Sequence, residues 1–411
     1  MRKIKILLVV NEPIGGCEYH RQIMPHAHLM RTYPDRYEIT TVNQKFLITE
    51  PDLRTDMFAQ YDIVSFCRHI LPVSSADDII ADANVAGAVI HFDIDDYWHL
   101  SPNHINHRDS MINKTADRII KNLQAADIVT TTTPYLASLI NRYNSNVKVV
   151  PNAIDPTENQ WDIIDNPSPL TRFGWVGSIC HREDIALMEK GIKKIWVDKT
   201  IAGKFQFVLG GFGLGEFVRT PMMRENGELY LKTVRKDPEH QTHVFFEKVF
   251  SDYYTFKHDY PEYYEGLMRF DEKMEAVVDV PYRRLWAVDT YHYGKFYNEW
   301  DVTLVPLNRN TFNCSKSQLK VIESGFMGKA VICSGIITYT QDIIHNQNGM
   351  LIAPGDDKAW HRVIRTMVNE PQMRKELASN LRDHVVSRYH IDTVNRLRDE
   401  IYRKLAVYVL V

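Results

Sequence analysis

Residues 313–325, NCSKSQLKVIESG, lie between two short apolar runs of the sequence. The runs are DVTLVPL at 301–307 and KAVICSG at 329–335, and each has the length and composition of a buried strand. A strand, a helix and a second strand in this order form the repeating unit of parallel α/β sheets. We therefore predict a short loop and a helix at 313–325 that connect two buried parallel strands.

The charged residues of this predicted helix are in an unusual order. Lys316 and Lys320 fall in its first turns, and Glu323 follows on the same face. The helix macrodipole disfavours cations at a helix N-terminus, and two lysines four residues apart repel each other by about 0.2–0.5 kcal/mol. An anion at this end would bind the cations and the free backbone N–H groups together. The alternative is a solvent-exposed face with a Lys320–Glu323 pair.

The composition is typical of a soluble globular protein, with 44% hydrophobic and 25% charged residues. A length of 411 residues is enough for two domains, and a net charge of −3 gives no overall attraction to nucleic acid or anionic lipid. We find no apolar run of about 18 residues, so we expect no membrane span. The five cysteines lack a CxxC spacing, which favours a reducing compartment, and we expect a cytoplasmic protein.

Short apolar or β-branched runs recur along the chain, and most are separated by stretches long enough for a helix. In the first 150 residues they are 4–10, 37–42, 62–66, 88–92, 127–132 and 147–150. Later they are 172–177, 205–210, 276–280, 301–306, 329–334 and 350–353. Such alternation predicts α/β architecture, with two successive doubly wound parallel sheets.

The domain boundaries follow from composition. The segment Pro151–Pro169 is rich in Pro, Asn and Asp and is typical of a linker. We predict Rossmann-like domains at 1–165 and 166–385 and a C-terminal helix at 386–411, whose packing back on the N-terminal domain stays open. Residues 216–272 form an insertion dense in aromatic and charged side chains, either a satellite core, a lid or an acceptor-recognition element. Ligands of such domains bind beyond the carboxyl ends of the strands, here in the cleft between the domains.

The order of the motifs resembles the GT-B glycosyltransferases, and in particular the group 1, GT4-like family of retaining, nucleotide-sugar-dependent enzymes. The resemblance covers nearly the whole chain. It rests on the Gly15-Gly16 loop, VVPNAID at 149–155, GWVGSICHRED at 174–184, DVTLVPL, and KSQLKVIESGFMGKAVI at 316–332. The chain departs from the family's E-x7-E pattern because Ser315 stands eight residues before Glu323. The resemblance implies two Rossmann-like domains that face each other across a cleft, an N-terminal acceptor domain and a C-terminal donor domain.

The resemblance also implies a UDP- or GDP-hexose as the donor substrate, with no further cofactor and no metal. Ser315, Lys316 and Lys320 would contact the diphosphate, and Glu323 would accept hydrogen bonds from the ribose hydroxyls. Lys320 would also stabilise the charge that develops on the leaving phosphate. Gly15 and Gly16 would lie under the donor sugar and the acceptor.

The loop at 177–182 is a second candidate for phosphate binding. Gly177 and Ser178 follow a predicted strand and precede a predicted helix, so the backbone could approach a ligand closely, and His181 or Arg182 could add charge. The alternative is a plain strand-to-helix turn with no ligand.

Three carboxylates crowd the stretch HFDIDDYWHLSPNH at 91–104, where the first sheet should open onto the cleft. Asp93, Asp95 and Asp96 would raise one another's pKa and offer base or hydrogen-bond chemistry to a hydroxyl group. The nearby histidines suggest a metal site as the lesser alternative. In retaining enzymes the leaving phosphate is thought to take the proton from the acceptor hydroxyl. No protein base is then required, and the aspartates would instead orient substrate groups.

The predicted function is transfer of a hexose, with retention, to a hydroxyl of a glycan or a lipid-linked precursor. One alternative keeps this chemistry and takes a hydroxymethylated base in DNA as the acceptor, as phage transferases of this architecture do. A third hypothesis is a non-catalytic nucleotide-sugar-binding protein, and a fourth is an epimerase. The sequence does not indicate the oligomeric state.

Overall fold

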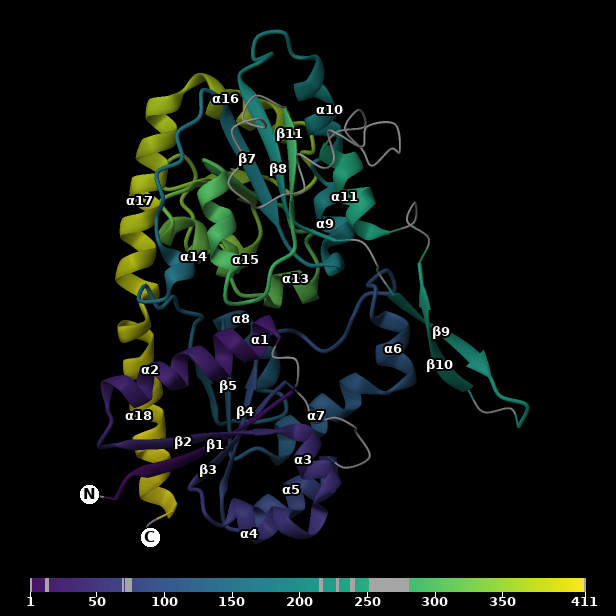
Figure 1. Cartoon of the computed structure of the whole chain (residues 1–411), viewed down its shortest axis with the longest axis vertical. Helices are drawn as coiled ribbons and strands as arrows, with labels where there is room; N and C mark the ends of the chain where they lie inside the picture. The colour runs from purple at the N-terminus through teal and green to yellow at the C-terminus, as the bar shows by residue number, and fades with distance from the viewer. Residues whose placement is uncertain are drawn as a thin grey trace.

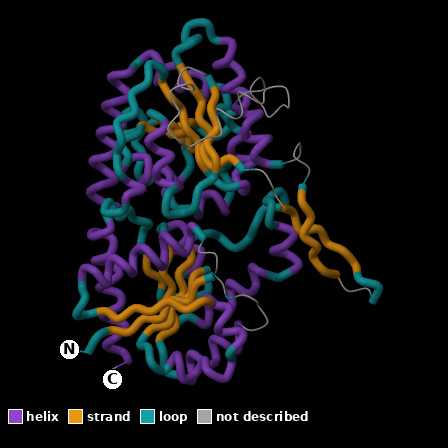
Figure 2. Tube along the Cα trace, viewed as in Figure 1, coloured by secondary structure: helices purple, strands orange, loops and turns teal. Residues whose placement is uncertain are grey.

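The computed structural model describes residues 2–11, 15–68, 70, 76–213, 217–226, 229–236, 241–250 and 281–409. The N-terminal and C-terminal halves of the chain form two stacked lobes, and two long C-terminal helices run along one side of both (Figure 1). Each lobe contains a six-stranded parallel sheet between layers of helices (Figure 2). This arrangement confirms the predicted pair of doubly wound domains.

The N-terminal sheet has the strand order β2-β1-β3-β4-β5-β6. Its strands are β1 (Ile4–Val10), β2 (Tyr37–Asn43), β3 (Ile63–Cys67), β4 (Val89–Ile94), β5 (Ile128–Thr131) and β6 (Val147–Val149). β3 and β5 are buried along their whole length and β1 at every residue but Lys5, which explains their apolar runs. The helices are α1 (Gly16–Glu18), α2 (Met24–Thr32), α3 (Gln44–Thr49), α4 (Arg54–Phe58), α5 (Ala76–Val85), α6 (His107–Ile112), α7 (Thr115–Ala125) and α8 (Pro134–Ile140).

The C-terminal sheet has the strand order β11-β8-β7-β12-β13-β14. Its strands are β7 (Thr171–Val176), β8 (Phe205–Phe212), β11 (Tyr282–Trp286), β12 (Val302–Val305), β13 (Ala330–Ser334) and β14 (Met350–Ile352). Its helices are α9 (Arg182–Ala186), α10 (Glu189–Val197), α11 (Thr242–Phe250), α13 (Thr311–Ser315), α14 (Leu319–Phe326), α15 (Ile337–Thr340) and α16 (Ala359–Asn369). Among the described residues, no helix combines the length and the apolar character needed to cross a lipid bilayer.

The insertion predicted at 216–272 is described only in part. Strands β9 (Phe217–Met223) and β10 (Leu229–Arg235) pair as an antiparallel ribbon that projects beside α6 (Figure 1). Helix α11 then packs on the C-terminal sheet. Residues 251–272, and the strand predicted at 276–280, lie outside the described residues.

The two lobes are joined by two chain crossings that lie side by side. Helix α17 (Pro371–Tyr389) packs on α14, and α18 (Ile391–Val409) packs on α2 and β1 of the N-terminal lobe. At the break between them, Ile154 of the linker donates a hydrogen bond to Tyr389 O and accepts one from Ile391 N, with N···O distances of 3.0 and 2.9 Å. The C-terminal helix predicted at 386–411 is thus divided at His390, between α17 and α18.

The region 313–325 forms two helices where the sequence predicts one. Helix α13 ends at Ser315, the backbone of Lys316 is extended (φ −63°, ψ 153°), and α14 begins at Leu319. The α13 carbonyl of Asn313 accepts a hydrogen bond of 2.6 Å from the Thr338 hydroxyl. This tertiary contact competes with continuation of the helix, so Lys316 lies before α14 and Lys320 lies in its first turn.

Candidate functional site

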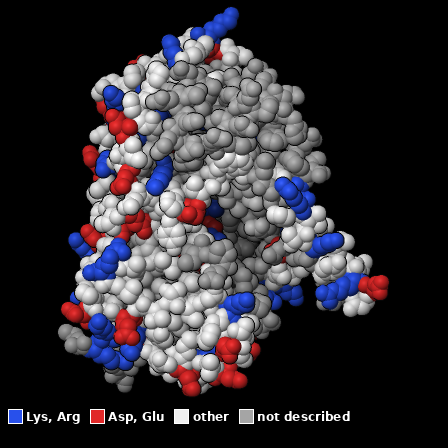
Figure 3. Space-filling view, viewed as in Figure 1, with Lys and Arg blue, Asp and Glu red and all other residues white. Residues whose placement is uncertain are grey.

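A cavity of about 820 Å³ separates the carboxyl ends of the two sheets. It faces the gap between β1 and β3 in one sheet and between β7 and β12 in the other, where the strand order of each doubly wound sheet reverses. Ligands of open α/β sheets bind at these two kinds of position. A hollow is visible between the lobes in the space-filling view (Figure 3). The cavity is therefore the candidate site.

The glycine turn after β1 forms one wall of the cavity. Gly15 and Gly16 are exposed and line it, and Gly15 is the cap of α1. The buried Glu18 carboxylate holds this turn, since it accepts hydrogen bonds of 2.8 Å from the backbone and the side chain of Asn11 and one of 3.1 Å from Gly15 N. A π-helical turn at Tyr19–Ile23 follows and connects α1 to α2. Such turns are frequent at functional sites.

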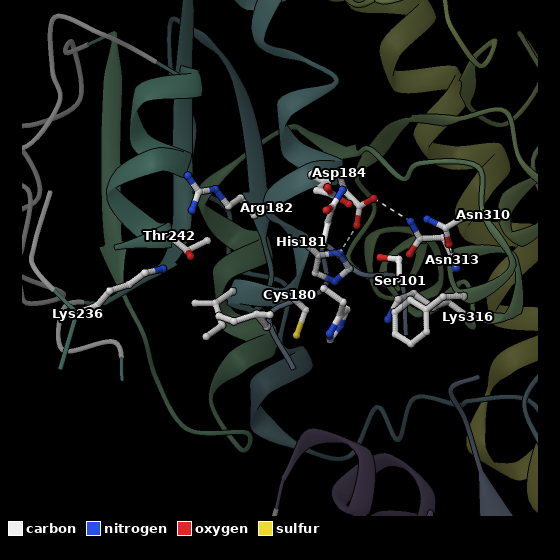
Figure 4. A pocket seen from close by; sticks show the side chains of 16 residues that line it. Ser101, Cys180, His181, Arg182, Asp184, Lys236, Thr242, Asn310, Asn313 and Lys316 are labelled. Atoms are coloured by element: carbon white, nitrogen blue, oxygen red, sulfur yellow. Dashed lines mark hydrogen bonds and ion pairs between the residues drawn. The ribbon is translucent and has the colours of Figure 1, made fainter. Parts of the chain in front are cut away.

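The loop after β7 forms the opposite wall. Gly177 and Ser178 line the cavity, and a Cβ atom on Gly177 would lie only 2.9 Å from the Trp175 ring, so no side chain fits there. A hydrogen bond of 2.8 Å joins His181 Nδ1 to Asp184 Oδ2 (Figure 4). Burial, together with the charge on Lys320, lowers the pKa of His181 to about 4, so the imidazole is neutral at pH 7.

Asp184 connects the two C-terminal loops of the site. Its other oxygen accepts hydrogen bonds of 2.8 Å from Asn308 N and from the Asn313 side chain. Arg182, in contrast, lies over the Phe245 ring at 4.7 Å and faces a smaller adjoining pocket (Figure 4). Of the two predicted cations of this loop, His181 alone lines the larger cavity.

The lysines of the α13–α14 region both line the cavity. Lys316 Nζ lies 3.3 Å from Asp96 Oδ1 of the other lobe, and 4.4 Å from the centre of the Phe312 ring. Burial lowers the pKa of Lys320, and the charge on Lys316 lowers it further, against the attraction of Glu323. Both ammonium groups are therefore held close together at one end of α14.

The two serines of this region point in different directions. The Ser315 side chain is buried and donates a hydrogen bond of 2.7 Å to Thr311 O within its own helix. Ser317 lines the cavity and accepts a hydrogen bond of 2.9 Å from the Asn152 side chain. Of the two, Ser317 is therefore the one placed to meet a ligand, a position that the sequence motifs did not indicate.

Glu323 lies fully buried at the inner end of the cavity. Its Oε2 accepts hydrogen bonds of 2.6 Å from Tyr297 and 3.4 Å from Tyr293. Within the described part of the chain, Oε1 has no hydrogen-bond partner, and neither has Nδ1 of the buried His20, whose Nε2 lies 3.9 Å from Oε1. Burial raises the pKa of Glu323 to about 7, although Tyr297 and Lys320 act in the opposite direction. The site thus contains a buried carboxylate with one unused oxygen.

The three aspartates of 91–104 divide into two groups. Asp93 is buried beneath the cavity, where its two oxygens accept hydrogen bonds of 2.7 and 2.8 Å from Arg21. Burial raises the pKa of Asp93, but the Arg21 charge outweighs this effect and holds the pKa below its usual value. Asp93 therefore fixes Arg21 in the protein interior.

Asp95 and Asp96 line the cavity and both form ion pairs with Arg68. Burial raises the pKa of Asp96, but the charges on Lys316 and Arg68 outweigh it and hold the pKa well below its usual range. Asp96 is therefore ionised and bound to cations, which suits it to orienting groups. No cluster of three or more His, Cys, Asp or Glu side chains that could hold a metal ion occurs among the described residues.

Arg68 is a site residue that the sequence motifs did not indicate. It directly follows β3, and its backbone has a positive φ of 60°, a strained conformation for a residue other than glycine. Its position as the first charged residue after a buried strand was a signal that could have identified it. Tyr293 and Tyr297 were also missed, and their spacing in an irregular segment gave no such signal.

A second cavity, of about 700 Å³, adjoins the first beyond the Asp96–Lys316 pair. Aromatic and basic side chains of the N-terminal lobe line it, including Tyr97, His104 and Arg108. Trp98 also lines it, and its buried indole nitrogen has no hydrogen-bond partner within the described residues. The two cavities share lining residues, among them Arg68, Asp96 and Lys316.

Neither a family model nor a curated protein sequence matches this chain. Solved structures do match it. HepE of Anabaena, in complex with UDP and glucose, superposes with a TM-score of 0.62 at 13% identity, covering 98% of this chain and 100% of that one. A glycosyltransferase from Rickettsia africae gives 0.62 at 12% identity, covering 98% and 99%. The sucrose-phosphate synthase of Thermosynechococcus elongatus gives 0.63 at 12% identity, covering 99% and 100%. The chain therefore has the two-domain GT-B fold that its sequence motifs led us to expect.

Proposed function

We propose that this protein is a retaining glycosyltransferase that transfers a hexose from a UDP-sugar to a hydroxyl group. The observation that carries the proposal is the unused oxygen of buried Glu323 at the end of a cavity that also holds Lys316 and Lys320. A buried carboxylate oxygen without a hydrogen-bond partner, as Oε1 is within the described part of the chain, is unfavourable in a protein interior, so its retention here fits a ligand that donates hydrogen bonds to it. The similarity to HepE, which was crystallised with UDP and with UDP-glucose, supports uridine as the base.

In this proposal the donor binds in the cavity in one orientation. Its ribose hydroxyls donate to Glu323 Oε1, and its diphosphate lies between Lys316, Lys320 and the backbone N–H groups that begin α14. Ser317 and the Gly177–Ser178 turn close around the phosphates. The hexose then extends toward the Gly15–Gly16 turn, where the absence of side chains leaves room for it.

In the proposed reaction, the lysine side chains stabilise the negative charge that develops on the leaving phosphate. As the bond between the anomeric carbon and the β-phosphate oxygen breaks, negative charge develops on that phosphate. Lys320 and the helix N-terminus are already oriented toward it, so little reorganisation is needed. The phosphate then takes the proton of the acceptor hydroxyl on the same face of the sugar, which gives retention. Asp95 and Asp96 orient groups in this scheme, and neither a metal nor another cofactor takes part.

The second cavity is the proposed acceptor site. Its aromatic side chains and the unpaired Trp98 N–H suit a carbohydrate, whose apolar ring faces stack on aromatics and whose hydroxyls accept hydrogen bonds. A glycan or a lipid-linked sugar would present its hydroxyl past Arg68 to the donor. Because all five cysteines have free thiols, we place the reaction in the cytoplasm.

Two measurements test the proposal. Thermal denaturation with UDP, GDP and ADP should give the largest rise in Tm with UDP, since a ligand that binds only the folded state stabilises it. Turnover of UDP-hexose should release UDP, and Lys320→Ala should abolish this release, whereas Lys193→Ala on the exposed face of α10 should not. An acceptor screen should then favour oligosaccharides over hydroxymethylated duplex DNA. Interconversion of the sugar without release of UDP would indicate an epimerase and would overturn the proposal.

A further inference from the structure

Two cysteines meet inside the candidate site although 50 residues separate them in the sequence. Cys17 lies in α1, directly after the Gly15–Gly16 turn, and Cys67 is the last residue of β3. Their Sγ atoms are 3.4 Å apart, and both side chains line the larger cavity. Both thiols are free. No step of the proposed transfer reaction uses either sulfur atom.

The surrounding structure holds the two sulfur atoms near bonding distance. A disulfide bond is about 2.05 Å long, so the sulfur atoms need to approach by only about 1.4 Å. Strands β1 and β3 are hydrogen-bonded neighbours, with Val9 opposite Phe66, so the two chain segments that carry the cysteines leave the same edge of one sheet. Side-chain rotation and a small shift of the short α1 segment are enough to close the gap.

The pair is accessible from the cavity. Cys17 is partly exposed there, whereas Cys67 is buried behind it, so a small oxidant reaches Cys17 first. Burial raises the pKa of the Cys17 thiol. Because the thiolate is the form that reacts with peroxide, this raised pKa makes oxidation slow at neutral pH, and formation of the bond needs excess peroxide or prolonged exposure.

We propose that Cys17 and Cys67 form a redox modification site that hydrogen peroxide converts to an intramolecular disulfide. Peroxide first oxidises the Cys17 thiol to a sulfenic acid and leaves as water. The Cys67 sulfur then attacks the Cys17 sulfur, and the sulfenic oxygen leaves as a second water. In total, two thiols and one peroxide give one disulfide and two waters, and the two electrons pass to the peroxide.

The bond has a consequence for the cavity. It ties the Gly15–Gly16 turn to the end of β3 beside Arg68, so this wall of the site can no longer adjust to a ligand. Oxidation then weakens UDP-sugar binding about tenfold or more, and a thiol reductant restores it. This consequence rests on the proposed function, whereas the formation of the bond does not.

Peptide mapping by mass spectrometry tests the bond directly. Full-length protein treated with hydrogen peroxide, with remaining thiols blocked, should yield a peptide pair joined through Cys17 and Cys67 that dithiothreitol separates. Cys17→Ser and Cys67→Ser should each abolish the pair, and Cys314→Ser should keep it. The oxidised wild-type protein should also melt roughly 5 °C or more above the reduced form, because the bond closes a loop of about 50 residues. Recovery of both thiols unlinked, or of Cys17 as sulfinic acid without the linked pair, would overturn the proposal.

UDP titration of the reduced and oxidised forms separates the two proposals. Tight binding by the reduced form alone supports the regulatory consequence, and equal binding by both forms refutes it. If neither form binds UDP while the linked peptides are present, the proposed function fails and the modification site stands.

Discussion

Replacement of Glu323 by Gln should make the ligand-free protein more stable and its complex with UDP weaker. The folded protein holds the Glu323 proton with a pKa of about 7, above the ordinary value of 4.5. The free energy of unfolding of the wild type therefore falls as the pH rises from about 4.5 to 7, and the full loss remains above pH 7. A neutral amide has no such loss.

The size of the effect follows from the two pKa values. The difference between 4.5 and about 7, at about 1.36 kcal/mol for each tenfold change in proton affinity, corresponds to about 3 kcal/mol at pH 8. The Gln oxygen can still accept the hydrogen bond of 2.6 Å from Tyr297. UDP binding, however, loses a charge-assisted hydrogen bond, which is worth about 1.5–3 kcal/mol, or roughly 10- to 100-fold in Kd.

Chemical denaturation at pH 5 and pH 8 and UDP titration at pH 8 measure both effects. The difference in unfolding free energy between Glu323→Gln and the wild type should grow between these pH values, which isolates this carboxyl from every other titrating group. A matched control is Glu247→Gln, because Glu247 is equally buried but forms an ion pair with Arg284 away from the cavity. That control should be less stable than the wild type and should bind UDP normally.

Two results would refute the reasoning. If Glu323→Gln loses stability at pH 8, as Glu247→Gln is expected to do, the unused oxygen of Glu323 is not an unfavourable buried charge. If it binds UDP as tightly as the wild type, Glu323 does not face the ribose. Both results together would make Glu323 an ordinary structural residue.

Three further substitutions test the site and its support. Lys320→Ala should lower kcat for UDP-hexose turnover by 100-fold or more and should also weaken UDP binding, because the ammonium group contacts the diphosphate in the complex and stabilises the charge that develops on it in the transition state; a change in KM alone would contradict this. Asp184→Asn should leave the Tm within a few degrees but reduce turnover, since it weakens the hydrogen bond of 2.8 Å that orients His181, and unchanged kinetics would exclude that role. Gly325→Ala should lower the unfolding free energy by about 1–3 kcal/mol in denaturant melts, because the new Cβ would lie 2.4 Å from Val385 where α14 packs on α17; a neutral result would show that α17 can shift.

The fold was predictable because its information is local. Parallel strands that are buried on both faces require continuous apolar runs. This chain contains two successive series of such runs, separated by gaps long enough for helices. The break between α13 and α14, after Ser315, could not be predicted from local sequence in this way. Its position depends on the Thr338 hydroxyl, which bonds to Asn313 O from a helix beyond the next strand, and no pattern within 313–325 indicates that contact.

The sequence allowed us to predict which residue types line the candidate site, but not which side chains they pair with. Strand-end position and charge identified Asp93, Asp95 and Asp96 together, but their environments differ because of two arginines far away in the sequence. Arg21, 72 residues before Asp93, forms an ion pair with Asp93 inside the protein. Arg68 forms ion pairs with Asp95 and Asp96 at the cavity wall. The pairing of long-range charges is set by the fold, so a single sequence gives the charges and not their partners.

The Asp96–Lys316 pair gives a physical account of the misplaced cations at the start of α14. Without a ligand, Lys316 is balanced by a carboxylate from the opposite lobe, 3.3 Å away, while burial and Lys316 together lower the pKa of Lys320. A diphosphate carries more charge than one carboxylate and reaches both lysines, so in our proposal it displaces Asp96 and raises the pKa of Lys320 again. Donor binding would then replace the Asp96–Lys316 contact between the lobes with contacts between the lysines and the diphosphate. In this proposal, the order of charges that disfavours an isolated helix thus links donor binding to the Asp96–Lys316 contact between the two lobes.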